Sequence, residues 1–508
     1  GGDTMSFKVV SNTTRFVIDG NSRISLSNND SGTSNTIFGK TAGDSDGAGD
    51  LNVFIGELAG GTGTQTDNAD SNVGVGYRAL TDLTSGANNS SVGKDSGTNL
   101  TSGSMNAILG VDALYTSTDV DKCIAIGKNA MYAGNATSDA DGTIAIGYDA
   151  GRAIISSVGS IAIGYEALNV EDDGDFSTAV GYQALKAQTG TSGAVGNSAV
   201  GYQSGKDITT GISNTLMGYN AGIALTESSG NVAIGKDALA LETVGLYSTA
   251  VGERALWQQN TGDTASSENT AVGYQSGYFL TTANKGTFIG YRAGKGISGT
   301  RLTGDSNTAV GADAGIELEG AAHSNTFLGS FAGNTTEAGY ENTCLGYNTE
   351  TDDDTATNQI VIGANTTGQA DNSVTLGNAS VTDVYMAMNV GARFTIGTGG
   401  AVTMPNQPAF LVHATSTQAD IAINSTVEIV FGTEIFDQGG DFASNTFTAP
   451  VTGKYQLNFG TKLLLMDSAA DYYAFYVTTS NRLYATQMDP DFGQDSPYQT
   501  FQWSALVD

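Results

Sequence analysis

The segments Asn269-Thr-Ala-Val-Gly-Tyr274 and Ser177-Thr-Ala-Val-Gly-Tyr182 are copies of one short phrase that recurs through most of this 508-residue chain. Aligned on its glycine, the phrase occurs 20 times between Gly39 and Gly377, and twelve of the 19 intervals between these glycines are 17 residues long. The other intervals are 14, 18, 20 or 21 residues, and the extra residues fall between phrases. Self-similarity at a fixed short period predicts a solenoid whose outer loops accommodate the insertions.

Each position of the phrase keeps its own residue type, which indicates the structure of one coil. The residue before the glycine is apolar in all 20 copies, and Thr, Val or Ile predominates two positions earlier. Such alternation predicts a short strand bent at its glycine, and we expect a second short strand in the following Tyr-Gln-Ala-Leu segment. Stacked coils place like on like, so the apolar column is expected to form a continuous core. The pattern leaves open whether this column faces the chain's own core or a three-fold axis.

The opposite face of each predicted strand is small or amide-bearing. Ala is commonest two residues before the glycine, and Asn stands four residues before it in 12 copies. Stacked Asn side chains predict an amide ladder along the coils. Ala or Ser three residues after the glycine, in the first 17 copies, marks a close approach of two backbones. Because a 17-residue coil encloses little volume, we expect neighbouring chains to complete the core, with a homotrimer preferred.

The distribution of proline indicates a domain boundary. All five prolines lie in the last 104 residues, and residues 1–404 contain none. We interpret 1–34 as lead-in strands, 35–380 as the solenoid shaft, 381–404 as a neck or linker, and 405–508 as an antiparallel domain. Alternation in this last domain predicts the strands Phe410–His413, Val427–Ile435, Tyr455–Met466, Tyr472–Thr478 and Tyr498–Ser504.

One stretch of the last domain carries a more specific pattern. Phe447, Gly453, Tyr455, Leu457 and Phe459 resemble, in their spacing, the core of the complement globular-head domain, a trimeric jelly roll of the tumour-necrosis-factor type. Leu457 stands where an aromatic residue is commoner in that family. The resemblance implies trimerisation and a longer domain, so we expect the jelly roll of 405–508 to be incomplete at its C-terminal end.

The repeats also resemble a known family. Ile124-Ala-Ile-Gly127, Ile161-Ala-Ile-Gly164 and Val232-Ala-Ile-Gly235 are similar to the head repeats of YadA-like trimeric adhesins, although the usual coil of that family is shorter. The longer Asn-Thr-Ala-Val-Gly-Tyr-Gln-Ala-Leu version resembles repeats in predicted tail fibres of marine bacteriophages. The resemblance covers about residues 20–390. It implies an all-β chain, with a trimeric parallel β-roll or β-solenoid of about 20 coils before the jelly roll.

Composition excludes several classes of function. The 52 acidic and 21 basic residues give a net charge of −31, which repels nucleic acid, and no run of about 18 apolar residues could form a membrane-spanning helix. The two histidines, His323 and His413, and the two cysteines, Cys123 and Cys344, offer little for general-base or zinc chemistry. We expect both cysteines to be small packed residues. We also expect no enzyme activity, because the carboxylates of a polysaccharide-cleaving tailspike would be paired in a groove, whereas these are scattered.

Acidic, glycine-bearing loops between the coils are the only metal-site candidates. The carboxylates concerned are Asp44, Asp46, Asp50, Glu171, Asp172, Asp173 and Asp175. Calcium prefers such oxygen-rich turns, but none matches the EF-hand spacing. We interpret the loops as solvated turns, with calcium binding as the alternative and no other cofactor expected. The tyrosines that often follow the glycine are interpreted as packing residues at a coil corner, with stacking on sugars as their alternative.

These observations predict a structural and host-recognition fibre, a bacteriophage tail fibre located in the virion tail. The solenoid would be the shaft, and unspecified loops of 405–508 would bind a host-surface glycan or protein through three tips at once. Other virion tail proteins would attach through a region before residue 1, without nucleic-acid binding or membrane insertion. The alternative is a cellular trimeric adhesin or extracellular surface filament.

Overall fold

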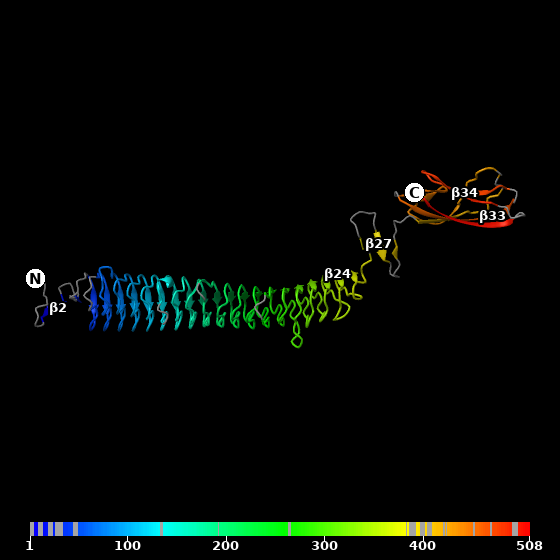
Figure 1. Cartoon of the computed structure of the whole chain (residues 1–508). Coiled ribbons are helices and arrows are strands. Elements are labelled where there is room, and N and C mark those ends of the chain that lie inside the picture. The colour runs from blue at the N-terminus through cyan, green and yellow to red at the C-terminus, as the bar shows by residue number, and fades with distance from the viewer. Residues whose placement is uncertain are drawn as a thin grey trace. The chain divides into compact units, whose positions relative to one another are not determined.

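The computed structural model is all-β and divides into two compact units, 1–378 and 379–508 (Figure 1). Its one helix within the described residues is the 3₁₀ turn Ser138–Ala140. Described are residues 5–8, 14–18, 24–25, 34–43, 49–132, 136–190, 193–262, 266–382, 384–385, 393–396, 402–403, 409–419, 422, 424–450, 453–467, 470–489 and 496–507.

The first unit is a parallel β-solenoid of about 19 turns, which confirms the fold predicted from the repeat. Each phrase contributes one three-residue strand that pairs in register with the next, as Thr178 does with Ser198. The strands are β4 (Thr36–Phe38), β5 (Val53–Ile55), β6 (Val73–Val75), β7 (Ser90–Val92), β8 (Ala107–Leu109), β9 (Ile124–Ile126), β10 (Ile144–Ile146), β11 (Ile161–Ile163), β13 (Thr178–Val180), β15 (Ser198–Val200), β16 (Thr215–Met217), β17 (Val232–Ile234), β18 (Thr249–Val251), β19 (Thr270–Val272), β20 (Thr287–Ile289), β21 (Thr308–Val310), β22 (Thr326–Leu328), β23 (Thr343–Leu345), β24 (Ile360–Ile362) and β25 (Val374–Leu376).

The interior of each coil is lined by the middle residue of the strand. This position is most often Ala and is buried in the coils from β5 to β24, with Phe54, Phe288 and Phe327 as its largest members. The sequence left open which way the column before the glycine faces, and in the structure its side chains point outward: Leu109 is 49% and Met217 50% exposed. Larger side chains such as Leu80 and Leu168 are also fully buried inside the coils, which leaves room for only a small residue at most of the middle strand positions.

The repeated glycine is required by its backbone. From Gly39 to Gly363 its φ lies between 131° and 148°, a region that other residues rarely adopt. A Cβ atom on Gly218 would lie only 2.6 Å from the carbonyl oxygen of Gly235 in the next coil. Glycine therefore permits both the bend of the coil and the close stacking of its neighbour.

The second short strand predicted in each coil is wrong. The Tyr-Gln-Ala-Leu segment is a tight turn, in which Gln183 has φ 55° and Leu185 has φ 48°. The residue two after the glycine is left-handed, with φ of 50–63°, in all 19 coils from Gly39 to Gly363. These left-handed residues reverse the chain within a few positions, so it returns to the sheet in 17 residues.

The predicted amide ladder is confirmed and lies inside the solenoid. The Asn214 amide nitrogen donates to Asn197 Oδ1 at 3.1 Å and to the Ser228 carbonyl oxygen at 2.8 Å. Asn214 Oδ1 in turn accepts from the backbone N–H of Asn231 at 3.0 Å. Because each side chain satisfies groups in neighbouring coils, the buried polar column adds specific coil-to-coil bonds.

Shorter strands accompany the solenoid in the first unit. Three antiparallel strands precede it, β1 (Met5–Lys8), β2 (Thr14–Ile18) and β3 (Ile24–Ser25). Two more, β12 (Gly174–Asp175) and β14 (Gly193–Ala194), form a small parallel pair between the loops of two successive coils.

The second unit consists of antiparallel pairs. β33 (Tyr455–Met466) matches its predicted range, but Val427–Ile435 overlaps β30 only at its end, and β35 was not predicted. The remaining topology of a jelly roll stays a prediction. The strands are β26 (Val384–Tyr385), β27 (Arg393–Ile396), β28 (Val402–Thr403), β29 (Ala409–His413) with β30 (Thr433–Gln438), β31 (Phe442–Ala443) with β32 (Thr446–Phe447), β33 with β36 (Ser496–Val507), and β34 (Tyr473–Thr478) with β35 (Leu483–Met488).

Candidate interaction surfaces

A continuous apolar surface runs along the outside of the solenoid sheet. We define the outer stripe as the residue before each repeated glycine, and none of its 20 side chains is buried. Thr, Val or Ile two positions earlier lies on the same face of each strand. Apolar patches of this extent mark association surfaces. The outer stripe is Phe38, Ile55, Val75, Val92, Leu109, Ile126, Ile146, Ile163, Val180, Val200, Met217, Ile234, Val251, Val272, Ile289, Val310, Leu328, Leu345, Ile362 and Leu376.

The tyrosines after the glycines form a stacked ladder. From Tyr148 to Tyr219, five successive rings lie 5.0–5.2 Å apart, with interplanar angles of 7–10°. Their side chains are 40–48% exposed, but the ring faces cover one another and leave mainly edges and hydroxyls to solvent. This geometry favours the packing interpretation over stacking on sugars, which requires a free ring face.

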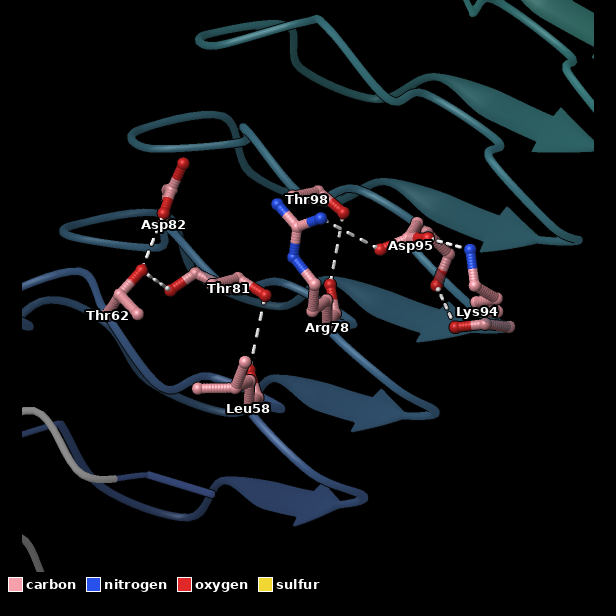
Figure 2. A network of polar contacts seen from close by, with 10 residues as sticks. Leu58, Thr62, Arg78, Thr81, Asp82, Lys94, Asp95 and Thr98 are labelled. Atoms are coloured by element: carbon pink, nitrogen blue, oxygen red, sulfur yellow. Dashed lines mark hydrogen bonds and ion pairs between the residues drawn. The ribbon is translucent and has the colours of Figure 1, made fainter. Parts of the chain in front are cut away.

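Charged side chains two residues after the glycine connect successive coils. Arg78 Nη1 lies 3.4 Å from Asp95 Oδ1, and Lys94 pairs with the other oxygen of this nearly buried carboxylate (Figure 2). Its hydrogen bond to Asp95 raises the pKa of the Lys94 ammonium group. Arg292 makes two bonds to Asp313, at 2.7 and 3.0 Å, across a later pair of coils. These charged groups pair with one another between coils, so they stabilise the stack.

The metal-site candidates do not converge on one point. Asp44 and Asp46 lie outside the described residues, and nowhere in the described part do three or more His, Cys, Asp or Glu residues form a group that could hold a metal ion. Asp173 Oδ1 accepts from Ser156 Oγ at 2.6 Å, and Asp175 Oδ1 accepts from the Val158 N–H at 2.8 Å.

The remaining two aspartates also serve the loops. Asp172 Oδ1 accepts from the backbone N–H of Asp173 at 3.0 Å, and the Asp50 N–H donates to Asp70 Oδ1 at 2.7 Å. Carboxylates at several candidate positions therefore bind backbone and hydroxyl groups of the loops. Calcium binding stays a prediction.

Glu171 differs from the other candidates because it is fully buried. Its carboxylate accepts from the N–H groups of Gly174 at 2.6 Å and Gly190 at 3.0 Å, and from the side-chain amide of Gln188. Burial raises the pKa of this carboxyl group, and the hydrogen bonds oppose the shift. Gln188 also donates to Ser177, which stands in the asparagine column and interrupts the amide ladder. The Glu171–Gln188 pair supplies hydrogen bonds at this interruption, and we call such a pair a plug.

A second plug occurs four coils later, and it was not predicted from the sequence. Glu242 accepts from Gly245 N–H at 2.9 Å and from the Gln259 amide at 3.0 Å, and Gln259 donates to Ser248. The signal is a serine in the asparagine column followed by glutamine 11 residues later, as in Ser248 and Gln259. Two copies of this arrangement indicate a structural device rather than a catalytic acid.

The cysteines are small packed residues, as predicted. Cys123 and Cys344 are buried and free, and burial raises the pKa of their thiols to about 11 and about 12. Both thiols therefore stay protonated and unreactive near neutral pH. The His323 ring stacks on Tyr340 at 5.0 Å, and His413 ends strand β29.

The second unit carries the loops predicted to bind a receptor. Asp437 accepts from the backbone N–H groups of Asp441 at 3.0 Å and Phe442 at 2.9 Å, which holds the turn between them. The Phe410 ring stacks on Phe442 at 4.8 Å and on Phe447 at 5.0 Å beside this turn. The loop is thus fixed by its own contacts, and the choice of receptor loop stays a prediction.

Comparison of the chain with protein-family models and with curated proteins gave no match. In the part of the chain that the structure describes, no helix has both the length and the apolar character needed to cross a membrane. The function is therefore inferred from the outer stripe and the other surfaces of the chain.

Proposed function

We propose that the chain forms a homotrimeric extracellular fibre, in which the outer stripes of three solenoids face a common axis. The observation that carries the proposal is the outer stripe itself. Each coil fills its own interior with alanine and larger apolar residues such as leucine, yet 20 further apolar side chains remain exposed or half-exposed in register along one face. Burial of this face against other chains would explain why every copy has an apolar residue at this position.

The magnitudes favour association. Burial contributes about 25 cal/mol per Å² of apolar surface, so the exposed part of each stripe side chain is worth roughly 1 kcal/mol. Twenty such residues per chain exceed the 4–15 kcal/mol or so that association costs in lost motion. The net charge of −31 opposes uncontrolled lateral association of the finished rods.

Within this assembly we assign host recognition to the loops of 405–508, as the tip of a bacteriophage tail fibre. A long regular shaft sets reach, and three tips would bind a surface glycan or protein by avidity. A cellular adhesin uses the same parts, so gold-labelled antibody against the chain is the discriminating probe. Labelling of virion tails supports the tail fibre, whereas labelling of cell surfaces supports the adhesin.

Light scattering of the full chain tests the assembly. A mass near three times 51.9 kDa is expected, and a stable monomer at micromolar concentration would contradict the proposal. Repeating the measurement with a chelator tests the calcium alternative, because loss of the trimer on chelation would assign the acidic loops a metal. A charge reversal in the 438–441 turn, made in the trimer, should weaken binding to host cells if this loop contacts the receptor.

A further inference from the structure

One of the two longest coils of the solenoid lies between Gly290 and Gly311. It has 21 residues, four more than the usual coil, and its loop over 296–301 projects from the yellow-green part of the stack (Figure 1). Both ends are fixed to neighbouring coils: the Gly296 N–H donates to the Ile316 carbonyl at 2.9 Å, and Leu302 is fully buried. Closing a coil does not require these extra residues, since twelve intervals close with 17.

A shallow polar cleft lies against this loop. It encloses about 620 Å³ and is open to solvent, and its lining comes from four successive coils. At about 4.8 Å per coil, the cleft extends roughly 15–20 Å along the stack. The apolar surface of Leu241 contributes to one end, and the polar lining consists of Gln258, Asn260, Thr281, Thr300, Arg301 and Thr303.

Arg301 is the charged group of the cleft, and its environment is unlike that of the other arginines in the described solenoid. Arg78, Arg254 and Arg292 pair with aspartates, and Arg152 lies over the Tyr132 ring. Within the described residues, Arg301 has neither a carboxylate nor a ring as partner, and it is exposed. In a chain of net charge −31, an arginine without an internal carboxylate is suited to bind one from outside.

A second group in the cleft also lacks a partner. Gln258 Oε1 is shielded from solvent, yet it accepts no hydrogen bond from the described residues. An unsatisfied acceptor of this kind is uncommon in folded proteins, but an atom without accessible surface does not contact a ligand, so Gln258 serves only as part of the wall. The groups that match sugar hydroxyls are the threonine hydroxyls and the Asn260 amide.

We infer that this cleft binds an acidic oligosaccharide, a chain of sugars that carries carboxylate groups. Arg301 would hold a carboxylate through its paired N–H groups, Asn260 and the threonine hydroxyls would bond to sugar hydroxyls, and Leu241 would contact a sugar's C–H face. The length of the cleft suits three or four sugar units lying along the rod. The site is separate from the tip loops and from the outer stripe, so it adds a contact along the shaft to the proposed fibre.

Titration calorimetry of the full chain with tetragalacturonate, and with its methyl ester as the uncharged counterpart, tests the inference. Binding of the acid should weaken at least about tenfold in Arg301→Gln, because a charge-assisted pair is lost. The matched control Arg152→Gln removes the same charge elsewhere on the solenoid and should bind as the parent does. Since Arg301 is exposed and unpaired within the described chain, thermal unfolding of Arg301→Gln should not change.

Several results would overturn the inference. They are absence of tetragalacturonate binding by the parent chain, equal binding of the methyl ester, equal weakening by the two arginine variants, and equal competition by tetraglutamate. The mass of each sample is measured in parallel. A monomer that still binds would refute the trimer but retain the cleft, whereas a trimer that does not bind would refute only the cleft.

Discussion

The solenoid and the antiparallel unit bury their side chains very differently. In the solenoid, Ala, Leu and Phe side chains are shielded completely by the next coil of the same chain. In the unit after residue 378, Met466, Ala505 and Val507 are the buried side chains among those described. Its long strand β33 alternates between exposed and half-buried residues, and Leu465 is 86% exposed.

The difference shows two ways in which a β-protein can complete a core. A solenoid contacts itself at every turn, so its stability is local and each coil depends on its neighbours. The antiparallel unit leaves apolar side chains such as Leu464 and Leu465 exposed, and we expect other chains to cover them in the proposed trimer. Substitutions in matched pairs, one in each unit, test this contrast.

The largest effect is expected at the repeated glycines. Gly218→Ala places a Cβ 2.6 Å from the Gly235 carbonyl oxygen at φ 136°, and should destabilise the adjacent coils by about 3 kcal/mol or more. Gly460→Ala in β33 meets no atom within 4 Å and should change stability by less than about 0.5 kcal/mol. Hydrogen exchange of peptides from each unit measures both. Equal protection in the two variants would contradict the local-stacking argument.

The next effect is expected in the amide ladder. Asn214→Ala removes a buried side chain that bonds to both neighbouring coils. It should lower the free energy of unfolding by about 2–3 kcal/mol. Asn458→Ala, at an exposed site of β33, serves as the counterpart and should be nearly neutral. Denaturant unfolding followed by circular dichroism distinguishes them, and a neutral Asn214→Ala would show that the ladder contributes little.

A smaller effect, dependent on pH, is expected at the buried Glu171. Burial raises the folded-state pKa above the unfolded value of about 4.3, so the folded state holds the proton longer as pH rises. Stability from this group is therefore present at low pH and is lost as pH rises through that range. Between pH 4 and 7 the parent should lose stability relative to Glu171→Gln, whose side chain does not titrate. The opposite slope would mean that the N–H donors outweigh burial.

The smallest effect on folding is expected at the outer stripe. Val200→Lys combined with Met217→Lys changes side chains that are 38% and 50% exposed, so the coils should keep their stability within about 0.5 kcal/mol per site. The mass by light scattering should nevertheless fall from trimer towards monomer. Ile212→Lys, 42% exposed but outside the strands, is the control that should stay trimeric. An unchanged mass in the double variant would refute the assigned axis.

The sequence predicted the period, the strand before each repeated glycine, the amide ladder and the packed cysteines, because each of these occupies one column of the repeat. It did not reveal which face of the strand is inside, since alternation distinguishes two faces without orienting them. The sequence does not distinguish the tight turn at Gln183 and Leu185 from a strand, because left-handed residues other than glycine carry no strong sequence signal. The plugs and the cleft are formed by residues of different coils, so they cannot be predicted from the pattern of a single repeat.

The two Glu–Gln plugs have a consequence for how such a rod changes length. Glu171 and Glu242 are 71 residues apart, which is four coils, and the serine and glutamine of each plug keep the same spacing. The plugs thus place similar junctions four coils apart, between which a block of coils could be duplicated or deleted with the Glu–Gln contacts retained. Each whole coil gained or lost would change the length of the shaft by about 5 Å, so duplication or deletion of repeats would change this length only in fixed steps.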